Sequence, residues 1–515
     1  MDPAEDQKQV IRFMACPESH GGIATRVERV ETHISQIFLA GDRAYKLKRA
    51  VRFPYLDFTT RDLRRAACEA EVAVNRRTAP ELYKGVVAVT RTEDGALRLG
   101  GDGEAVEWLV EMTRFDQDAM FDRLARTGAM DRHLMEELAE VIARFHQAAE
   151  ESLEFGGHPG MAAIVDSNAQ CFADFGAPVL DAGRVESLNA ATRGALDDLG
   201  ALLEIRRKAG RVRHCHGDLH LRNIVLLDGR PTLFDAIEFS QSMARIDTLY
   251  DLAFLLMDLE HLGLRIPANV VLNRYLDITA DDDGLAALPL FCSVRAAVRA
   301  HVGAAAAASL SAAEEAGEQG AEASRYLDSA VAYLEPRPPR LVAIGGLSGS
   351  GKSRTARQVA PYVGLAPGAR VVRSDVIRKR LAGVDAYARL GPEGYAAELT
   401  ARTYQALVAD AARVLKTGHS VIADAVFARP DERRAIAAVA ARAGVPFTGL
   451  WLESPPDVMM RRVAQRRRNP SDATPDVVRQ QLAYDLDGID WKRIDSAGPK
   501  KQTVSRTLEV LVDSR

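Results

Sequence analysis

The sequence predicts an α/β protein of at least two domains, and three observations lead to this prediction. Its 515 residues are too many for a single hydrophobic core. Three prolines within residues 334–340 prevent helix continuation and favour an extended connector. Beyond the connector, an apolar stretch, a glycine-rich loop and a helix-favouring stretch follow one another, as in α/β proteins with a mostly parallel sheet.

The composition is that of an ordinary globular chain, with 47% hydrophobic and 27% charged residues. The net charge of −4 is unevenly divided between the two halves. Residues 340–515 hold 29 Lys and Arg against 18 Asp and Glu, or +11, whereas residues 1–339 hold 38 against 53, or −15. The basic half suggests a polyanionic ligand, and the opposite signs would equally favour docking of one half against the other.

Cysteine usage and hydropathy point to an intracellular protein. The five cysteines lie far apart and include no C-x-x-C pair. This pattern argues against a disulfide framework or a cysteine-built zinc site, and it is typical of a reducing compartment. The first ten residues lack the apolar core of a signal peptide, and no run of eighteen apolar residues occurs. We therefore expect a cytoplasmic protein without a membrane span.

The first half predicts a small β-rich lobe. Residues 26–34 and 36–48 indicate two strands around a short turn, and a helix is expected near residues 60–77. A further strand at 105–112 follows a glycine-rich hairpin signal at 100–103. We place this lobe at about residues 20–115.

A larger helical lobe is expected at about residues 116–333, ending in two Ala-rich helices with a break near 309–316. The predicted domains are therefore residues 1–333 and 341–515, joined by the proline-rich connector. The two halves carry different motifs, so the chain is not an internal duplication.

The second half begins with a phosphate-binding motif. Residues 341–344 predict a buried strand, and residues 346–353 fit G-x-x-x-x-G-K-[ST]. Its glycines allow successive backbone N–H groups to face phosphates at a helix N-terminus. Lys352 is expected to reach the β- and γ-phosphates and Ser353 to bind Mg²⁺. The predicted nucleotide contacts are Gly346, Ser348, Gly349, Ser350, Gly351, Lys352 and Ser353.

Two carboxylates follow apolar stretches downstream. Residues 369–375 indicate a strand that ends at Asp375, with Arg378 one helical turn later. Residues 421–424 indicate another strand that ends at Asp424, a candidate ligand for Mg²⁺ or its waters. Either aspartate alone could be a helix cap. Their joint occurrence after a phosphate loop favours a functional role.

An arginine series follows the next predicted strand, at residues 445–452. Arginines over a triphosphate neutralise charge during phosphoryl transfer, although a solvated basic helix face would have the same composition. Arg462 and Arg466 are the predicted nucleotide contacts in a series that comprises Arg461, Arg462, Arg466, Arg467 and Arg468.

These motifs, together with residues 471–473, resemble small P-loop kinases related to polynucleotide 5′-kinases and zeta toxins. The resemblance covers nearly all of residues 340–515 and implies a P-loop kinase fold. It implies that Asp375 activates an acceptor hydroxyl and that Arg378 orients the acceptor or the transferred phosphoryl group. P-loop domains also include switches and ATPases.

A second phosphotransfer motif lies in the first half. His216, Asp218 and Asn223 fit H-x-D-x-x-x-x-N, and Asp235 ends an apolar stretch twelve residues after Asn223. Asp218 would be the base for an acceptor hydroxyl, while Asn223 and Asp235 would be metal ligands. We expect His216 to brace the loop. A metal site built from His214, His216 and His220 is an alternative that this spacing does not require.

Residues 216–223, 234–238 and 250–253 resemble the aminoglycoside phosphotransferase and choline-kinase-like family. The resemblance implies a two-lobed, protein-kinase-like fold with ATP or GTP between its lobes. It also implies a small-lobe lysine and a helix glutamate. Lys46 and Lys48 share one face of a strand, which leaves the choice between them open, and Glu71 is preferred to Glu69.

The order of the two halves resembles proteins described as bifunctional aminoglycoside phosphotransferase/ATP-binding proteins. The leading hypothesis is a kinase with two Mg²⁺-dependent sites, each moving a γ-phosphoryl group to a hydroxyl. One half could instead regulate the other. A polynucleotide-kinase or nucleic-acid-binding role for the basic half is not favoured, because no aromatic-basic stacking signature accompanies the charge.

Overall fold

The computed structural model describes residues 3–53, 56–177, 179–310, 312–465, 470–486 and 488–513. The chain forms two compact units. The first comprises residues up to Ile164 together with Gly200–Asp258, and the second comprises Val165–Leu199 and everything from Leu259 onwards. The last helices before the connector therefore belong to the same compact unit as the P-loop half. The domain boundaries at 333 and 341 remain predictions from the sequence.

The first unit contains a six-stranded antiparallel sheet with the order β1-β2-β3-β8-β6-β7. The strands are β1 (Val27–Glu31), β2 (Ser35–Ala40), β3 (Arg43–Lys48), β6 (Tyr83–Arg91), β7 (Leu97–Leu99) and β8 (Glu104–Thr113). The single strand predicted at 36–48 was wrong: it is two strands, β2 and β3. Gly41 makes the turn between them with a φ of +59°, a conformation that glycine adopts without steric cost.

Helix α2 (Arg61–Asn75) forms where the sequence predicts a helix, and it packs on this sheet. Thr60 caps its first turn by accepting a hydrogen bond from the backbone N–H of Leu63. Cys68 and Val72 of the helix join a core with Val110 and Met112 of β8. This packing fixes the position of the polar residues on the same helix relative to β3.

The remainder of the first unit is mostly helical, with short β-ribbons that carry the second phosphotransfer motif. Two-stranded sheets pair β9 with β12 and β10 with β11. The elements are α1 (Pro3–Met14), β4 (Arg52–Phe53), β5 (Leu56–Asp57), α3 (Phe121–Thr127), α4 (Arg132–Ala148), β9 (Val212–His214), η3 (Leu221–Asn223), β10 (Ile224–Leu227), β11 (Arg230–Leu233), α7 (Gln241–Ala244), β12 (Arg245–Asp247) and α8 (Thr248–His261). Helices α5 (Gly157–Phe175) and α6 (Ala182–Lys208) continue from one unit into the other.

In the second unit, helices α10 (Leu288–Ser309) and α11 (Ala313–Leu334) confirm the predicted Ala-rich pair and its break. They follow α9 (Arg265–Thr279) and the 3₁₀ helix η4 (Asp282–Ala287). Among the described residues, the stretch Asp282–Ser309 is long and apolar enough to cross a membrane, but 72% of its most apolar window is buried inside the protein. Such burial is typical of a core helix, so this stretch is weak evidence for a membrane span.

The P-loop half is built on a parallel sheet with the order β14-β15-β13-β16-β17. The strands are β13 (Leu341–Gly345), β14 (Arg370–Arg373), β15 (Val421–Asp424), β16 (Phe447–Glu453) and β17 (Lys492–Asp495). The expected strand at 369–375 is shorter than predicted, because Ser374 and Asp375 already form the first turn of α13 (Ser374–Leu381). Asp375 therefore lies on a helix, directly after the strand.

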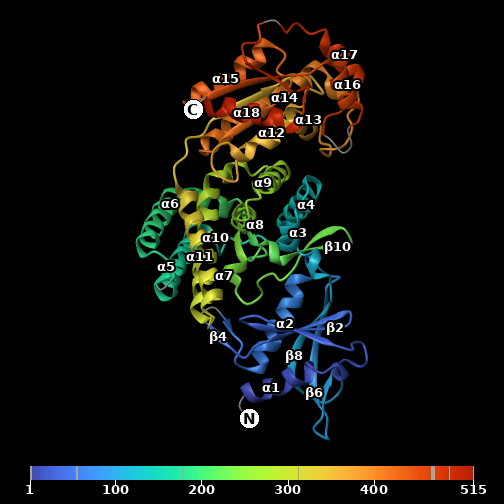
Figure 1. Ribbon diagram of the computed structural model, residues 1–515, viewed down its shortest axis with the longest axis vertical. Coiled ribbons are helices and arrows are strands. Elements are labelled where there is room, and N and C mark those ends of the chain that lie inside the picture. Colours follow the sequence, from blue (N-terminus) through green and yellow to red (C-terminus); the bar gives the residue numbers. More distant parts are fainter. Residues whose placement is uncertain are drawn as a thin grey trace. The chain divides into compact units, whose positions relative to one another are not determined.

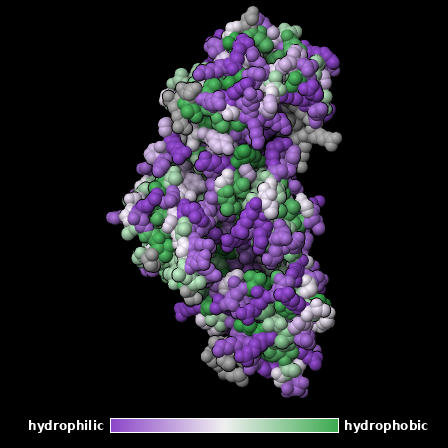
Figure 2. Space-filling model, viewed as in Figure 1, coloured by the Kyte–Doolittle hydropathy of each residue, from purple (hydrophilic) through white to green (hydrophobic). Residues whose placement is uncertain are grey.

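Helices cover both faces of this sheet, and α12 (Lys352–Val359) packs beside α18 (Lys500–Asp513) (Figure 1). Val342, Ile344, Ile422 and Leu450 lie in the core beneath α12. The other helices are α14 (Ala397–Lys416), α15 (Pro430–Ala443), α16 (Pro456–Ala464) and α17 (Pro475–Leu482). Figure 2 shows hydrophilic residues over much of the visible face, which agrees with apolar side chains being gathered in such cores.

Candidate active sites

Both candidate lysines of the first half contact the same glutamate. Lys46 Nζ lies 2.8 Å from Glu71 Oε1, and Lys48 Nζ forms an ion pair with Glu71 Oε2. Glu69 instead pairs with Arg65 on the exposed side of α2. The helix that packs on the sheet therefore brings Glu71, rather than Glu69, to the lysines.

The two lysines differ in their second partners. Lys46 Nζ also lies 2.5 Å from Asp235 Oδ1, the predicted metal ligand, whereas Lys48 pairs with the buried Glu238. The Lys46 side chain is 11% exposed and that of Lys48 only 1% exposed. Lys46 thus faces the predicted metal ligand, and Lys48 neutralises two carboxylates behind it.

These contacts keep the group ionised. Burial acts to lower the pKa of Lys46, but Asp235 and Glu71 raise it well above its ordinary value. Burial acts to raise the pKa of Glu71, but Lys46 and Lys48 lower it to about 2. A charged lysine at this position can bind phosphate oxygens.

Asp235 is held in a strained conformation by residues from two other elements. Its φ is +62°, which is uncommon for a residue with a side chain. Its backbone N–H donates to Tyr83 Oη at 3.1 Å, and the N–H of Ala236 donates to Asn75 Oδ1 at 2.8 Å. Sheet and helix together therefore orient this carboxylate toward Lys46.

The loop at residues 216–223 brings the predicted base and amide ligand together. Asn223 Nδ2 donates to Asp218 Oδ2 and to the Asp218 carbonyl, both at 2.9 Å. His216 is buried, and its Nε2 lies 2.9 Å from the carbonyl oxygen of Phe234, next to Asp235. Burial lowers the pKa of His216, which favours the neutral ring. His216 connects the base loop to the segment that carries the metal ligand.

Asp251 fixes the same loop from helix α8. Its carboxylate accepts the backbone N–H groups of His216 and Gly217 at 3.1 and 2.9 Å, and His146 Nε2 lies 3.0 Å away. With Cys215, these side chains form a compact, fully buried group of potential metal ligands. Because Asp251 is already occupied by backbone donors, the geometry is that of a structural brace.

A small apolar cavity borders Lys46 and Asp235. Its walls come from β2, β3, β8 and the segment that follows β8. The lining side chains include Ile37, Leu39, Ala44, Met112 and Phe234. A small apolar cavity beside a charged lysine is suited to an apolar ring with an attached anionic group.

In the P-loop half, the glycine-rich loop connects β13 to α12 as predicted. Gly346, Gly349 and Gly351 have φ values of 139°, 87° and 96°, which favour glycine. A Cβ atom at Gly349 would lie 2.5 Å from the Met459 carbonyl oxygen, so a side chain does not fit there. Lys352 is buried in the first turn of α12, and Ser353 follows it.

Two contacts hold this loop that the sequence did not predict. The backbone N–H of Ser348 donates to Gln481 Oε1 on α17 at 2.7 Å, and Ser496 Oγ donates to the Ser350 carbonyl at 2.6 Å. The hydroxyl of Ser350 is buried without a hydrogen-bond partner in the described residues.

The acceptor-side residues Asp375 and Arg378 lie on successive turns of α13. Arg378 Nη1 donates to the Gly394 carbonyl at 2.9 Å and to Thr400 Oγ1 at 3.1 Å, and its guanidinium lies over the Tyr395 ring. These partners are neutral, so the positive charge of Arg378 remains available to an anionic or hydroxyl-rich ligand.

Asp424 ends β15 in register with Ile344 of β13 and Arg373 of β14. Its Oδ2 accepts a hydrogen bond from Arg373 Nε at 3.3 Å, while its Oδ1 is buried without a partner in the described residues. A free carboxylate oxygen beside the phosphate loop fits Mg²⁺, which prefers oxygen ligands. Ser353 and Asp424 would hold the ion here, and Asn223 and Asp235 in the first half.

Comparisons with known proteins agree with this arrangement. The chain is 30% identical over 489 residues to the uncharacterized protein Rv2004c of Mycobacterium tuberculosis, a match that covers 93% of this chain and 94% of the relative. The uncharacterized protein Mb2027c of Mycobacterium bovis matches to the same extent. The chain belongs to this family.

Family models describe its two halves. Residues 41–288 match the phosphotransferase enzyme family, and residues 341–485 match an AAA domain. The predicted phosphotransferase-like half followed by a P-loop kinase-like half is thereby confirmed, as is the mixed α/β fold class. Both halves are of the kinase type and support a phosphotransferase.

Solved structures resemble each half separately. A choline/ethanolamine kinase family protein from Mesorhizobium loti covers 63% of this chain and 98% of its own, at 14% identity and a TM-score of 0.37. The APS kinase CysC of Mycobacterium tuberculosis, in complex with AMPPNP and APS, covers 35% and 98%, at 24% identity and a TM-score of 0.24.

Of the two arginines predicted to contact the nucleotide, Arg462 and Arg466, the structure describes only the first. Arg462 donates to Ser454 Oγ at 3.1 Å and to the Ser496 carbonyl at 2.8 Å, and its Nη1 lies 3.5 Å from the Gly349 carbonyl. It therefore borders the phosphate loop. Arg466, with Arg467 and Arg468, lies outside the described residues.

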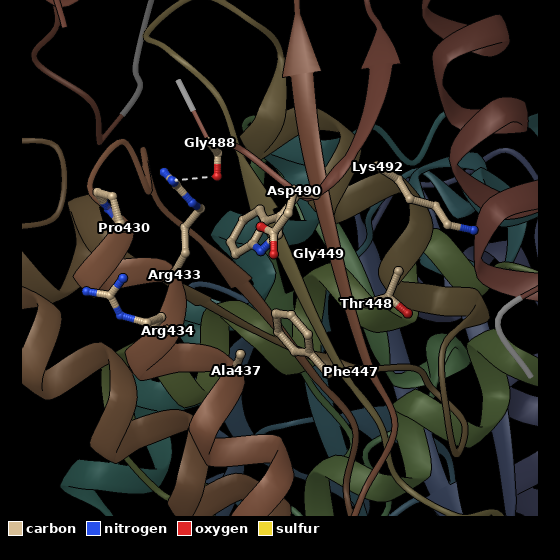
Figure 3. A pocket seen from close by; sticks show the side chains of 11 residues that line it. Pro430, Arg433, Arg434, Ala437, Phe447, Thr448, Gly449, Gly488, Asp490 and Lys492 are labelled. Atoms are coloured by element: carbon tan, nitrogen blue, oxygen red, sulfur yellow. Dashed lines mark hydrogen bonds between the residues drawn. The ribbon is translucent and has the colours of Figure 1, made fainter. Parts of the chain in front are cut away.

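A cavity of about 530 Å³ lies between α15, β16 and the start of β17. None of the residues 346–353 lines it. Figure 3 shows Arg433 at its wall, bonded to the Gly488 carbonyl; Arg433 also donates to the carbonyls of Phe427 and Ala428. Because the Arg433 guanidinium already donates hydrogen bonds to backbone carbonyls, we interpret its role in the cavity wall as structural. The phosphate loop does not contribute to this wall, so the cavity is not part of the predicted site.

Proposed function

We propose that this protein is a nucleoside-triphosphate-dependent phosphotransferase with two Mg²⁺-dependent sites. Each site transfers the γ-phosphoryl group of ATP or GTP to a hydroxyl group of a small molecule. The observation that carries the proposal is the bridge from Glu71 through Lys46 to Asp235. The first half also contains the loop at residues 216–223, which carries the predicted catalytic base. The second half contains the phosphate loop and two carboxylates.

In the first half, Lys46 binds phosphate oxygens of the nucleoside triphosphate. The apolar cavity beside Lys46 binds the nucleobase of the same nucleotide. Asp218 accepts the proton of the acceptor hydroxyl, whose oxygen bonds to the γ-phosphorus while the bond to the β–γ bridging oxygen breaks. The products are a phosphorylated acceptor and a nucleoside diphosphate. Asn223 keeps the Asp218 carboxylate in place through its hydrogen bond.

In the second half, the loop amides and Lys352 bind the triphosphate, and Asp375 accepts the acceptor proton. Arg378 orients the acceptor or the transferred phosphoryl group, and Arg462 borders the loop from the other side. Mg²⁺ would neutralise charge on the phosphate oxygens at both sites. We place the protein in the cytoplasm, where both nucleotides are available.

The experiment is a phosphate-transfer screen of a metabolite library with the wild type, Asp218→Ala and Lys352→Ala. Each product is expected to fall at least about 100-fold in one variant and not in the other, because the two sites act independently. If neither variant lowers any transfer or nucleotide hydrolysis, the proposal is wrong. Binding of short oligonucleotides that weakens with salt would instead favour the nucleic-acid role of the basic half.

A second candidate is one catalytic half regulated by the other. It is favoured by the ion pairs that join α9 and η4 to β14 within the second compact unit. This alternative predicts nucleotide binding at both sites but turnover at one. Titrating an ATP analogue into the two single variants, together with their turnover, distinguishes the two proposals.

A further inference from the structure

Arg373 is the last residue of β14 and contacts the predicted metal ligand of the P-loop half. Its side chain is nine-tenths buried, and its Nε donates to Asp424 Oδ2 at 3.3 Å. Asp375 follows two residues later at the start of α13. The guanidinium therefore contacts the carboxylate that ends β15, and the second carboxylate of the proposed site, Asp375, follows Arg373 closely in the first turn of α13.

The ion pair between Arg373 and Asp424 is only half made. An arginine offers Nε and Nη2 as a fork that can bind both oxygens of a carboxylate. Here Arg373 Nη2 and Asp424 Oδ1 are both buried without a hydrogen-bond partner in the described chain. Buried polar groups are rarely left unpaired, so each atom is suited to a bound ligand. The nitrogen can bind an anionic oxygen, and the oxygen can face a cation or its water.

Neighbouring cations are engaged elsewhere. Lys379 pairs with Asp472, and Arg380 pairs with Asp410. Burial acts to lower the pKa of Arg373, but Asp424 and Asp375 raise it, so the guanidinium remains charged. A fixed positive charge in contact with Asp424 repels a divalent cation, and this repulsion is strong where water is excluded.

We propose that Arg373 is a positioning residue that makes metal binding at Asp424 depend on bound nucleoside triphosphate, an inference that rests on the proposed function of the P-loop half. Without nucleotide, Arg373 restrains Asp424 and disfavours a cation. With nucleotide, Nη2 contacts a phosphoryl oxygen, and Asp424 presents its free oxygen toward the metal side. Arg373 thereby couples the two binding events.

The experiment measures Mn²⁺ binding by electron paramagnetic resonance, with and without a non-hydrolysable ATP analogue. The parent protein is the full chain with Asp235→Ala, which removes a predicted metal ligand from the first half. Arg373→Gln in this parent is compared with the parent itself and with Arg380→Gln in the same parent. Arg380 is the control position, because it lies on α13 and pairs with Asp410.

Arg373→Gln is expected to bind Mn²⁺ about tenfold more tightly without nucleotide, because the repelling charge is gone. The gain in Mn²⁺ affinity on adding the analogue should shrink by about tenfold, while Arg380→Gln matches the parent. Arg373→Lys keeps the charge but not the fork. It should match the parent without nucleotide and lose most of the gain. This second variant keeps the test decisive if Arg373→Gln does not fold.

Equal gains in the parent and in either Arg373 variant would overturn the inference, as would weaker Mn²⁺ binding by Arg373→Gln without nucleotide. A parent that binds no analogue would overturn the inference together with its premise. A parent that shows the coupling but transfers no phosphoryl group would overturn only the proposed function.

Discussion

Lys46 and Lys48 lie two residues apart on one strand, but their surroundings give them different tasks. Lys48 neutralises Glu71 and Glu238, whose side chains are 0% and 5% exposed. Lys46 shares Glu71 and reaches Asp235, whose side chain is 42% exposed. Removing Lys46 leaves Glu71 paired and Asp235 accessible to water. Removing Lys48 leaves a buried carboxylate without its cation.

We therefore expect Lys46→Met to lower mainly the phosphoryl-transfer rate and Lys48→Met to lower mainly the free energy of unfolding. Lys46→Met should lower transfer by the first half at least about 100-fold and cost about 1 kcal/mol of unfolding free energy. Lys48→Met should lower the free energy of unfolding by about 3–5 kcal/mol, because it leaves a buried carboxylate without its cation. Denaturant unfolding and turnover measure the two effects.

Lys84→Met on the exposed side of β6 is the control, and it should change neither quantity. The interpretation would be wrong if Lys48→Met were as stable as Lys46→Met. It would also be wrong if the Lys46 variant kept its turnover, because Lys48 would then be the phosphate-binding lysine.

At the scale of elements, local spacing predicted much of both sites. The phosphate loop, the Asp218–Asn223 loop and the carboxylates at strand ends depend on contiguous residues, so their geometry follows from the sequence near them. The different partners of Lys46 and Lys48 depend on the packing of α2 on the sheet, which no local pattern contains. Gln481, Ser496, Tyr83 and Asn75 were missed for the same reason, because each contacts its site from a distant segment.

The phosphate loop also depends on the close approach of another element. Gly349 has a positive φ, and a Cβ atom there would meet the backbone of Met459 in α16. Gly349→Ala should therefore lower the free energy of unfolding by about 1–3 kcal/mol, in addition to the effect of backbone strain. It should also weaken nucleotide binding by the second half at least about tenfold. Thermal unfolding and titration of an ATP analogue measure both effects.

Gly418→Ala is the matched control. Gly418 also has a positive φ, of +76°, but apart from its two chain neighbours no described residue has an atom within 4 Å of the position that a Cβ atom would take there. Its variant carries the backbone strain without the collision, so it should lose some stability and keep nucleotide affinity. Equal affinities in the two variants would show that the loop moves away from α16 without harm.

At the scale of the whole molecule, the last helices of the first half and the P-loop sheet meet within one compact unit. Arg370 at the start of β14 lies 2.7 Å from Asp277 of α9 and 2.7 Å from Asp282 of η4. Asn273 of α9 also accepts the N–H of Val371 at 2.7 Å, which satisfies an edge strand of the sheet. The P-loop half thus depends on residues that precede the proline-rich connector.

This dependence predicts that one substitution has different costs in two contexts. Arg370→Met in the full chain should cost about 3–5 kcal/mol, because the buried Asp282 loses its closest cation. In a fragment of residues 341–515, the partners at 273–282 are absent and water can reach Arg370. The same substitution should then change stability by no more than about 0.5 kcal/mol. Denaturant unfolding of the four proteins gives both costs, and equal costs would mean that the P-loop half folds independently of α9 and η4.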